Sequence, residues 1–133
     1  MHIIESADLL CPCCHTGFPD ARLIAGLNHL QALIGRELAV ASGFRCPKHN
    51  AESGGAPFSQ HLTGRAADIS APGLSPLHLY LAAEQIPLFQ RGGIGLYPLE
   101  YIHVDTREAR ARWFHYQGQD RAITDFLTFS PTS

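Results

Sequence analysis

The longest stretch of regular periodicity lies between Asp20 and Gly35, and the apolar segments that follow it are all short. Within this stretch leucine and isoleucine recur every three or four residues, which forms one apolar stripe along a helix. The stripe consists of Leu23, Ile24, Leu27, Leu30, Leu33 and Ile34. Asp20 is a suitable N-cap and Gly35 a suitable stop. The sequence therefore predicts one long helix, and any sheet must be built from short strands.

The later segments alternate between strand-like runs and turns. Short strands are predicted for residues 37–42, 66–70, 92–98, 100–106 and 110–116. A second helix is predicted at Ser75, because serine is a good N-cap and Pro76 takes the first helical position. The segment CPKHNAESGGAP is predicted to be a loop with at most one helical turn, since glycine and proline interrupt it. The tail from Asp120 is expected to add one short element.

This order of elements predicts an α+β fold with a mainly antiparallel sheet and flanking helices. The 133 residues, 45% of them hydrophobic, suit a single domain over residues 1–133 with a core of its own. The net charge of −2 argues against a nucleic-acid partner. The arginines of REARARW, residues 107–113, are expected to form a solvated face.

Neither a membrane span nor a targeting signal is predicted. No run approaches the roughly 20 apolar residues that a span needs. The segment MHIIESADLL has no basic region, and Glu5, Ser6 and Asp8 interrupt its apolar positions. We therefore expect synthesis in the cytoplasm, with release or another export route for any target outside the cell.

Four cysteines stand at Cys11, Cys13, Cys14 and Cys46. In a reducing cytosol they are expected to be free or buried thiols rather than an obligatory disulfide. The spacing C-x-C-C is not a standard zinc-finger spacing, although four thiols are a suitable ligand set for a structural zinc ion. Free thiols, a disulfide and a second, structural metal site all stay open.

Two histidines and an aspartate stand out against the apolar background. His61 and Asp68 are seven residues apart, which on a straight helix is about 10 Å. A zinc ion holds each ligand at roughly 2 Å, so both residues can bind one ion only if the chain turns at Gly64. His103 alternates with apolar neighbours on a predicted strand, and it shares a site with Asp68 if their strands are adjacent. Taken from the residues alone, ordinary structural histidines with a capping aspartate are the alternative.

Three blocks, SGFRCPKHN, GGAPFSQHLTGRAADI and GGIGLYPLEYIHVDTREARARW, cover roughly residues 40–113. Together they resemble the zinc D-alanyl-D-alanine carboxypeptidase family, which cuts peptidoglycan peptides and includes phage-type L-alanyl-D-glutamate endopeptidases. The resemblance implies the fold of the hedgehog and D,D-peptidase group. It also implies that His61, Asp68 and His103 are the ligands of one catalytic zinc ion, although cobalt or manganese suits the same ligands.

The resemblance also implies further site residues. Glu100, three residues before His103, takes the position of the general base, provided that the strand begins after it or a bulge redirects it. An exposed glutamate at a strand end is the alternative. Arg45 takes the position of the residue that stabilises the oxyanion or binds a substrate carboxylate. Ser59 either contacts substrate or caps its loop, and Asp105 either supports His103 or forms an ion pair with a neighbouring arginine.

The function that follows is a zinc-dependent peptidase acting on peptidoglycan stem peptides through a water activated at zinc. The resemblance allows a D-Ala-D-Ala carboxypeptidase, or an endopeptidase for L-Ala-D-Glu or for a cross-link. A compact phage-type lysis enzyme and a small intracellular recycling enzyme are both consistent with the chain. The alternative of a different class is a non-catalytic, zinc-stabilised module of the same fold that binds cell-wall peptides.

Overall fold

The structure, a computed structural model, describes residues 1–56 and 59–128. In these residues six strands form a sheet in the order β1-β2-β4-β3-β5-β6. The strands are β1 (Ala39–Ser42), β2 (Ala66–Ser70), β3 (Gly93–Tyr97), β4 (Tyr101–Asp105), β5 (Ala111–Tyr116) and β6 (Gln119–Ala122). Neighbouring strands are antiparallel except β3 and β5, which are parallel. The predicted α+β class with a mainly antiparallel sheet is therefore confirmed.

The helices begin where the sequence places capping residues. They are α1 (Ala21–Ile34), α2 (Pro47–Glu52), α3 (Pro76–Ala83) and α4 (Pro87–Gln90), with 3-10 turns η1 (Ser6–Leu9), η2 (Gln60–Thr63) and η3 (Ile123–Thr128). The Asp20 carboxylate accepts a hydrogen bond from the Arg22 N–H at 2.7 Å, and Gly35 ends α1 with a left-handed φ of 65°. Ser75 caps α3 in the same way. Both predicted helices are confirmed.

Two expectations about the connecting segments were wrong, and one short helix was missed. Residues 47–52 form a helix rather than at most one turn, because the Cys46 side chain caps it and Pro47 opens it. The tail forms two elements, β6 and η3, rather than one. The short helix α4, opened by Pro87, was not predicted. Pro57 and residues 129–133 lie outside the described residues.

The arginines of residues 107–113 form a solvated face only in part, because Arg110 has 54% of its side chain exposed while Arg107 and Arg112 are turned toward carboxylates. Arg112 binds Glu84 at 2.7 Å with its side chain only 7% exposed. Arg107 binds the buried Asp105, also at 2.7 Å. For Arg107 and Arg112 the expectation was wrong, because the carboxylates of Asp105 and Glu84 pack against their guanidinium groups.

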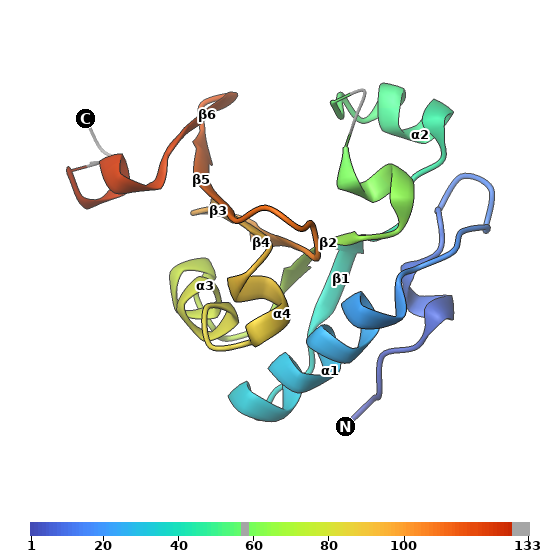
Figure 1. Cartoon of the computed structure of the whole chain (residues 1–133), viewed down its shortest axis with the longest axis horizontal. Coiled ribbons are helices and arrows are strands. Elements are labelled where there is room, and N and C mark those ends of the chain that lie inside the picture. Colours follow the sequence, from blue (N-terminus) through green and yellow to red (C-terminus); the bar gives the residue numbers. More distant parts are fainter. Residues whose placement is uncertain (57–58, 129–133) are drawn as a thin grey trace.

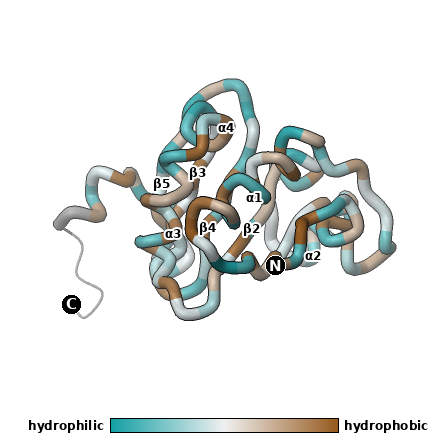
Figure 2. The backbone as a smooth tube through the Cα atoms, turned by 90° about the horizontal axis from the view of Figure 1, so that it is seen from below, coloured by the Kyte–Doolittle hydropathy of each residue, from teal (hydrophilic) through white to brown (hydrophobic). Residues whose placement is uncertain are grey.

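The helices α1, α3 and α4 gather on one side of the sheet, while α2 and η2 lie away from them (Figure 1). Hydrophobic segments concentrate around β2, β3 and β4 in the middle of the molecule (Figure 2). The side chains of Ile69, Ile102 and Val104 belong to this buried core. Because side chains alternate along a strand, Asp68 and His103 are turned to the opposite face of the sheet. No helix in the described residues is long and apolar enough to cross a membrane.

Gly64 reverses the chain between η2 and β2, as the sequence predicts. Its φ of 71° lies in the left-handed region, which costs a residue with a Cβ about 1–2 kcal/mol. A Cβ at this position would also contact the backbone carbonyl of Phe18. The neighbouring backbone is fixed there by a 2.8 Å hydrogen bond from the Asp20 N–H to the Gly64 carbonyl. Glycine is therefore required both by the conformation and by the space.

We expect Gly64→Ala to lower the free energy of unfolding by about 2–4 kcal/mol, since left-handed strain adds to a backbone clash. Gly35→Ala is the matched control, because Gly35 has a similar φ of 65° but open space around its Cβ position. It is expected to cost only about 1 kcal/mol. Urea unfolding of both variants with a chelator present measures the difference, and equal losses would contradict the role given to the Phe18 carbonyl.

Candidate metal centre

His61, Asp68 and His103 converge on one point above the sheet. His61 lies in η2, and Asp68 and His103 are direct register partners in β2 and β4. The Asp68 Oδ1 atom is 3.3 Å from His61 Nε2 and 3.2 Å from His103 Nδ1. All three side chains are buried, and their ligand atoms lie within 4.8 Å of one another. The structure thus brings together the three residues that the sequence singled out.

Hydrogen bonds orient both imidazole rings. His61 Nδ1 lies 2.7 Å from the Gly43 carbonyl oxygen, to which it donates, and this leaves the lone pair on Nε2. His103 Nε2 lies 2.7 Å from Asp105 Oδ2 and donates to it, which leaves the lone pair on Nδ1. His61 Nε2 and His103 Nδ1 therefore both face Asp68. Each nitrogen donates a hydrogen bond to Asp68 when it is protonated, and offers its lone pair to a metal ion when the ring is neutral. Two neutral imidazoles and one carboxylate are a ligand set for zinc, and three protein ligands are typical of a catalytic site.

Asp105 holds His103 from the side away from the candidate metal. Its carboxylate is fully buried and accepts hydrogen bonds from the Gly93 N–H at 2.8 Å and from Arg107 Nε at 2.9 Å. Burial alone would raise the pKa of Asp105, but its hydrogen bonds to His103 and Arg107 outweigh this and lower the pKa. Asp105 is therefore an anion that both supports His103 and pairs with Arg107, which combines the two roles expected for it.

Arg45 neutralises the other side of the Asp68 carboxylate. Its Nη2 atom is 3.2 Å from Asp68 Oδ2, while its Nε donates to Ser42 Oγ at 3.0 Å. Burial favours the neutral form of Asp68, but hydrogen bonds to His103 and His61 dominate and lower its pKa. One carboxylate oxygen thus faces the histidines and the other faces Arg45, so Asp68 is an ionised ligand of fixed orientation.

The three candidate ligands line a cavity of about 690 Å³. Arg45 and Ser59 belong to its wall, and Ser59 also caps η2 by accepting a hydrogen bond from the His61 N–H at 3.2 Å. Aromatic side chains line the cavity as well. They include Trp113, whose ring centroid is 5.1 Å from that of His103, and Tyr97. The lining of the cavity is thus both charged and aromatic.

The family of the chain follows from a comparison of sequences. The model of the family described as Peptidase M15 matches residues 5–105. The chain belongs to the peptidase M15 family. This confirms the resemblance stated above and makes the chain a member of a family of zinc enzymes. No curated protein matches the sequence.

The structure does not bring Glu100 of this M15 protein into the cavity. Strand β4 begins at Tyr101, so Glu100 lies in the turn that joins β3 to β4 and is exposed. It lines an adjoining pocket of about 290 Å³, and Tyr97 and His115 line both this pocket and the larger cavity. Strand β4 does begin after Glu100, which is the condition stated above for its role as general base. The Glu100 side chain nevertheless is not among the described residues that line the cavity of the candidate ligands.

A histidine–aspartate pair in the same cavity was missed by sequence reasoning. His115 Nδ1 lies 2.6 Å from Asp120 Oδ1, and the two residues are register partners in β5 and β6. Both residues line the same cavity as the three candidate ligands. The sequence signal was Gly118, because a two-residue hairpin turn favours glycine at its second position, and the structure has positive φ values at Gln117 and Gly118. Recognising this hairpin would have placed Asp120 opposite His115.

We expect Asp105→Asn to weaken zinc binding by about 10- to 100-fold, because His103 loses the anion that orients its ring. Competition with a chelating dye measures the affinity. Asp8→Asn is the control, since Asp8 forms a similar pair with His2 at 2.9 Å but is exposed and lies outside the cavity lining. An unchanged affinity in Asp105→Asn would show that the pair does not hold the ligand.

Proposed function

We propose that this M15 protein is a zinc peptidase that hydrolyses peptide bonds in peptidoglycan stem peptides. The observation that carries the proposal is the convergence of two oriented histidine lone pairs and an ionised aspartate in an open cavity. His61, Asp68 and His103 would hold the ion. When bound there, zinc supplies a Lewis acid that polarises a carbonyl group and acidifies water.

We assign to Arg45 the role of interacting with negative charge, either on the substrate or on the oxyanion that forms during hydrolysis. Its guanidinium group lines the cavity beside Asp68, with 14% of its side chain exposed. A guanidinium group at this position stabilises a developing oxyanion or binds a carboxylate of the substrate. Stem peptides carry free carboxylates at D-glutamate and at their C-terminus, so both roles suit this substrate class. Arg107 also lines the cavity, but its guanidinium group makes three hydrogen bonds to the Asp105 carboxylate. The guanidinium group of Arg45, by contrast, makes one to Asp68.

Two residues are candidates for the general base that transfers protons during hydrolysis. The resemblance assigns this role to Glu100, and His115 is the second candidate because it lines both the cavity of the three candidate ligands and the adjoining pocket that holds Glu100. Asp120 accepts the Nδ1–H of His115, which leaves Nε2 free to take a proton from the attacking water and to return it to the leaving amine. His115 lines the cavity and stacks on Tyr97, with ring centroids 4.9 Å apart. We therefore propose His115 as the base, supported by Asp120.

Mass spectrometry of digested peptidoglycan tests the function. Purified sacculi are incubated with the zinc-loaded protein and, as a control, with chelator-treated protein. We expect new fragments only with zinc. Loss of a terminal alanine would identify a carboxypeptidase, separation of cross-linked dimers a cross-link endopeptidase, and release of stem peptides that begin with D-glutamate an L-Ala-D-Glu endopeptidase.

The same experiment separates the enzyme from the binding module. Sacculi are also sedimented with the zinc-loaded protein, and the bound fraction is measured. Binding to the sacculi without cleavage, across walls of different stem-peptide chemistry, would contradict the peptidase and support a module that only binds cell-wall peptides.

A further inference from the structure

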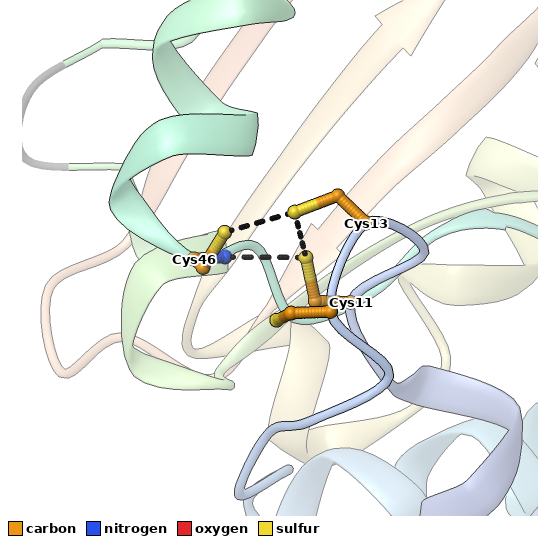
Figure 3. A group of neighbouring side chains, drawn as sticks. Cys11, Cys13 and Cys46 are labelled. Atoms are coloured by element: carbon orange, nitrogen blue, oxygen red, sulfur yellow. Dashed lines mark hydrogen bonds between the residues drawn. The ribbon is translucent and has the colours of Figure 1, made fainter.

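Four cysteine sulfurs converge on the N-terminal side of the molecule, apart from the three candidate zinc ligands. Cys11, Cys13 and Cys14 lie in the loop after η1, and Cys46 stands immediately before α2. Their Sγ atoms all lie within 4.8 Å of one another. Cys13 Sγ is 3.2 Å from Cys46 Sγ and 3.6 Å from Cys11 Sγ (Figure 3). This group is called the cysteine cluster below.

We propose that the cysteine cluster is a second metal site, which holds a structural zinc ion through four thiolates. Zinc–sulfur bonds of about 2.3 Å in a tetrahedron place the sulfur atoms about 3.8 Å apart. The separations in the cluster, from 3.2 Å up to 4.8 Å, span that value. Four protein ligands complete the coordination of zinc and leave no position for a substrate, which is typical of a structural site.

The loop that carries the first three cysteines is shaped to bring them together. The Cys11 N–H donates to the Thr16 carbonyl at 2.8 Å, and the His15 N–H donates to the Cys11 carbonyl at 2.7 Å. His15 has a left-handed φ of 56°, which is uncommon for a residue other than glycine. These features close a tight loop that turns toward Cys46. Such a conformation is stable only when other contacts determine it, and a bound ion supplies them.

Backbone N–H groups point at two of the sulfurs. The Cys46 N–H donates to Cys11 Sγ at 3.5 Å, and the His49 N–H donates to Cys46 Sγ at 3.4 Å. Hydrogen bonds of this kind favour the anionic thiolate, which is the form that binds metal. They also fix the direction of each sulfur, as the partners of metal ligands commonly do.

The two other states of the thiols explain less of this geometry. Each disulfide joins two sulfurs, so even two disulfides would pair the four sulfurs separately and give no reason for all four to surround one point. Burial of apolar surface accounts for Cys11, which is fully buried, but Cys13 and Cys14 are exposed. One ion at the centre accounts for all four positions, including the exposed ones.

The cysteine cluster joins the N-terminal segment to the backbone that orients His61. The Phe44 N–H donates to the Leu9 carbonyl at 2.8 Å, which connects the two segments. The Gly43 carbonyl accepts from His61 Nδ1, and the Arg45 N–H donates to the His61 carbonyl at 3.0 Å. Cys46 follows these residues directly, so an ion in the cluster fixes the end of the segment on which His61 depends.

Metal analysis of variants tests the proposal. The chain is purified with zinc, and zinc per chain is measured by plasma mass spectrometry. We expect two ions in the unaltered chain and one in a Cys13→Ser, Cys46→Ser double variant. We expect one ion also in the matched His61→Ala, His103→Ala double variant, and none in the variant that combines all four changes. Circular dichroism establishes that each variant is folded.

A second measurement on the unaltered chain keeps the proposal testable if a cysteine variant does not fold. Cobalt replaces zinc, and cysteines are counted by alkylation and mass spectrometry with and without chelator. We expect thiolate-to-cobalt charge-transfer absorption, and we expect the His61→Ala, His103→Ala variant to keep it. We also expect all four thiols to react with the alkylating reagent only when chelator is present. One ion per chain together with four reactive thiols, or with a disulfide, would overturn the proposal. Retention of both ions by a folded cysteine variant would overturn it as well.

Discussion

Replacing His103 with alanine is expected to remove zinc from the candidate active site and to abolish hydrolysis that depends on it. Only His61 and Asp68 then remain as ligands, and the buried carboxylates of Asp68 and Asp105 both lose a hydrogen-bond partner. Since the metal supplies several kcal/mol of transition-state stabilisation, we expect kcat/KM to fall by at least about 10³-fold. Zinc content and the rate of muropeptide release, measured on the same preparation, check this.

His29→Ala is the control for that experiment. His29 is an exposed histidine on α1, and it is not among the residues that line the cavity. The variant is expected to keep both zinc and turnover. A His103→Ala protein that still binds zinc at the site and cleaves sacculi at the normal rate would rule out the ligand assignment.

The second large effect is expected at His115. The change His115→Gln removes the nitrogen that takes the proton but leaves the three candidate ligands in place, so kcat should fall by about 10²- to 10⁴-fold while zinc stays bound. Glu100→Gln is the paired variant, and it should keep kcat within a few-fold because Glu100 does not line the cavity of the three candidate ligands. Rates under saturating substrate and zinc content are measured for both proteins.

The opposite result has an equally clear meaning. If Glu100→Gln abolishes turnover and His115→Gln does not, the base is the residue that the family resemblance implies, and the β3–β4 turn must bring it to the substrate. Asp120→Asn adds a third comparison. Because Asp120 acts through His115, we expect it to lower kcat less than His115→Gln does, with zinc content unchanged.

Much of the fold was predictable because its signals are local. The apolar stripe of α1, its N-cap Asp20 and its stop at Gly35 are set by residues within one segment. The turn at Gly64 also follows from local reasoning, since a single ion cannot reach His61 and Asp68 along a straight helix. The alternation of polar and apolar residues in β2 and β4 then predicts which side chains share a face.

The features that were missed depend on pairing between distant segments. Strand β5 lies parallel to β3, and this pairing places Trp113 beside Gly95 and its ring against that of His103. Glu84 reaches Arg112 from α3 across 28 residues of sequence. No local pattern specifies such pairs, because they depend on which strands become neighbours in the sheet.

The sequence by itself determined the candidate zinc ligands, the family and the order of most elements, because residue type and spacing carry that information. The tertiary structure decided what those residues do together. It oriented the rings of His61 and His103 through Gly43 and Asp105, and it placed His115 between the cavity of the candidate ligands and the pocket of Glu100. It also brought Cys46 to the three N-terminal cysteines. Each of these depends on distances of a few ångström between segments far apart in the chain, which only the packed sheet and its loops establish.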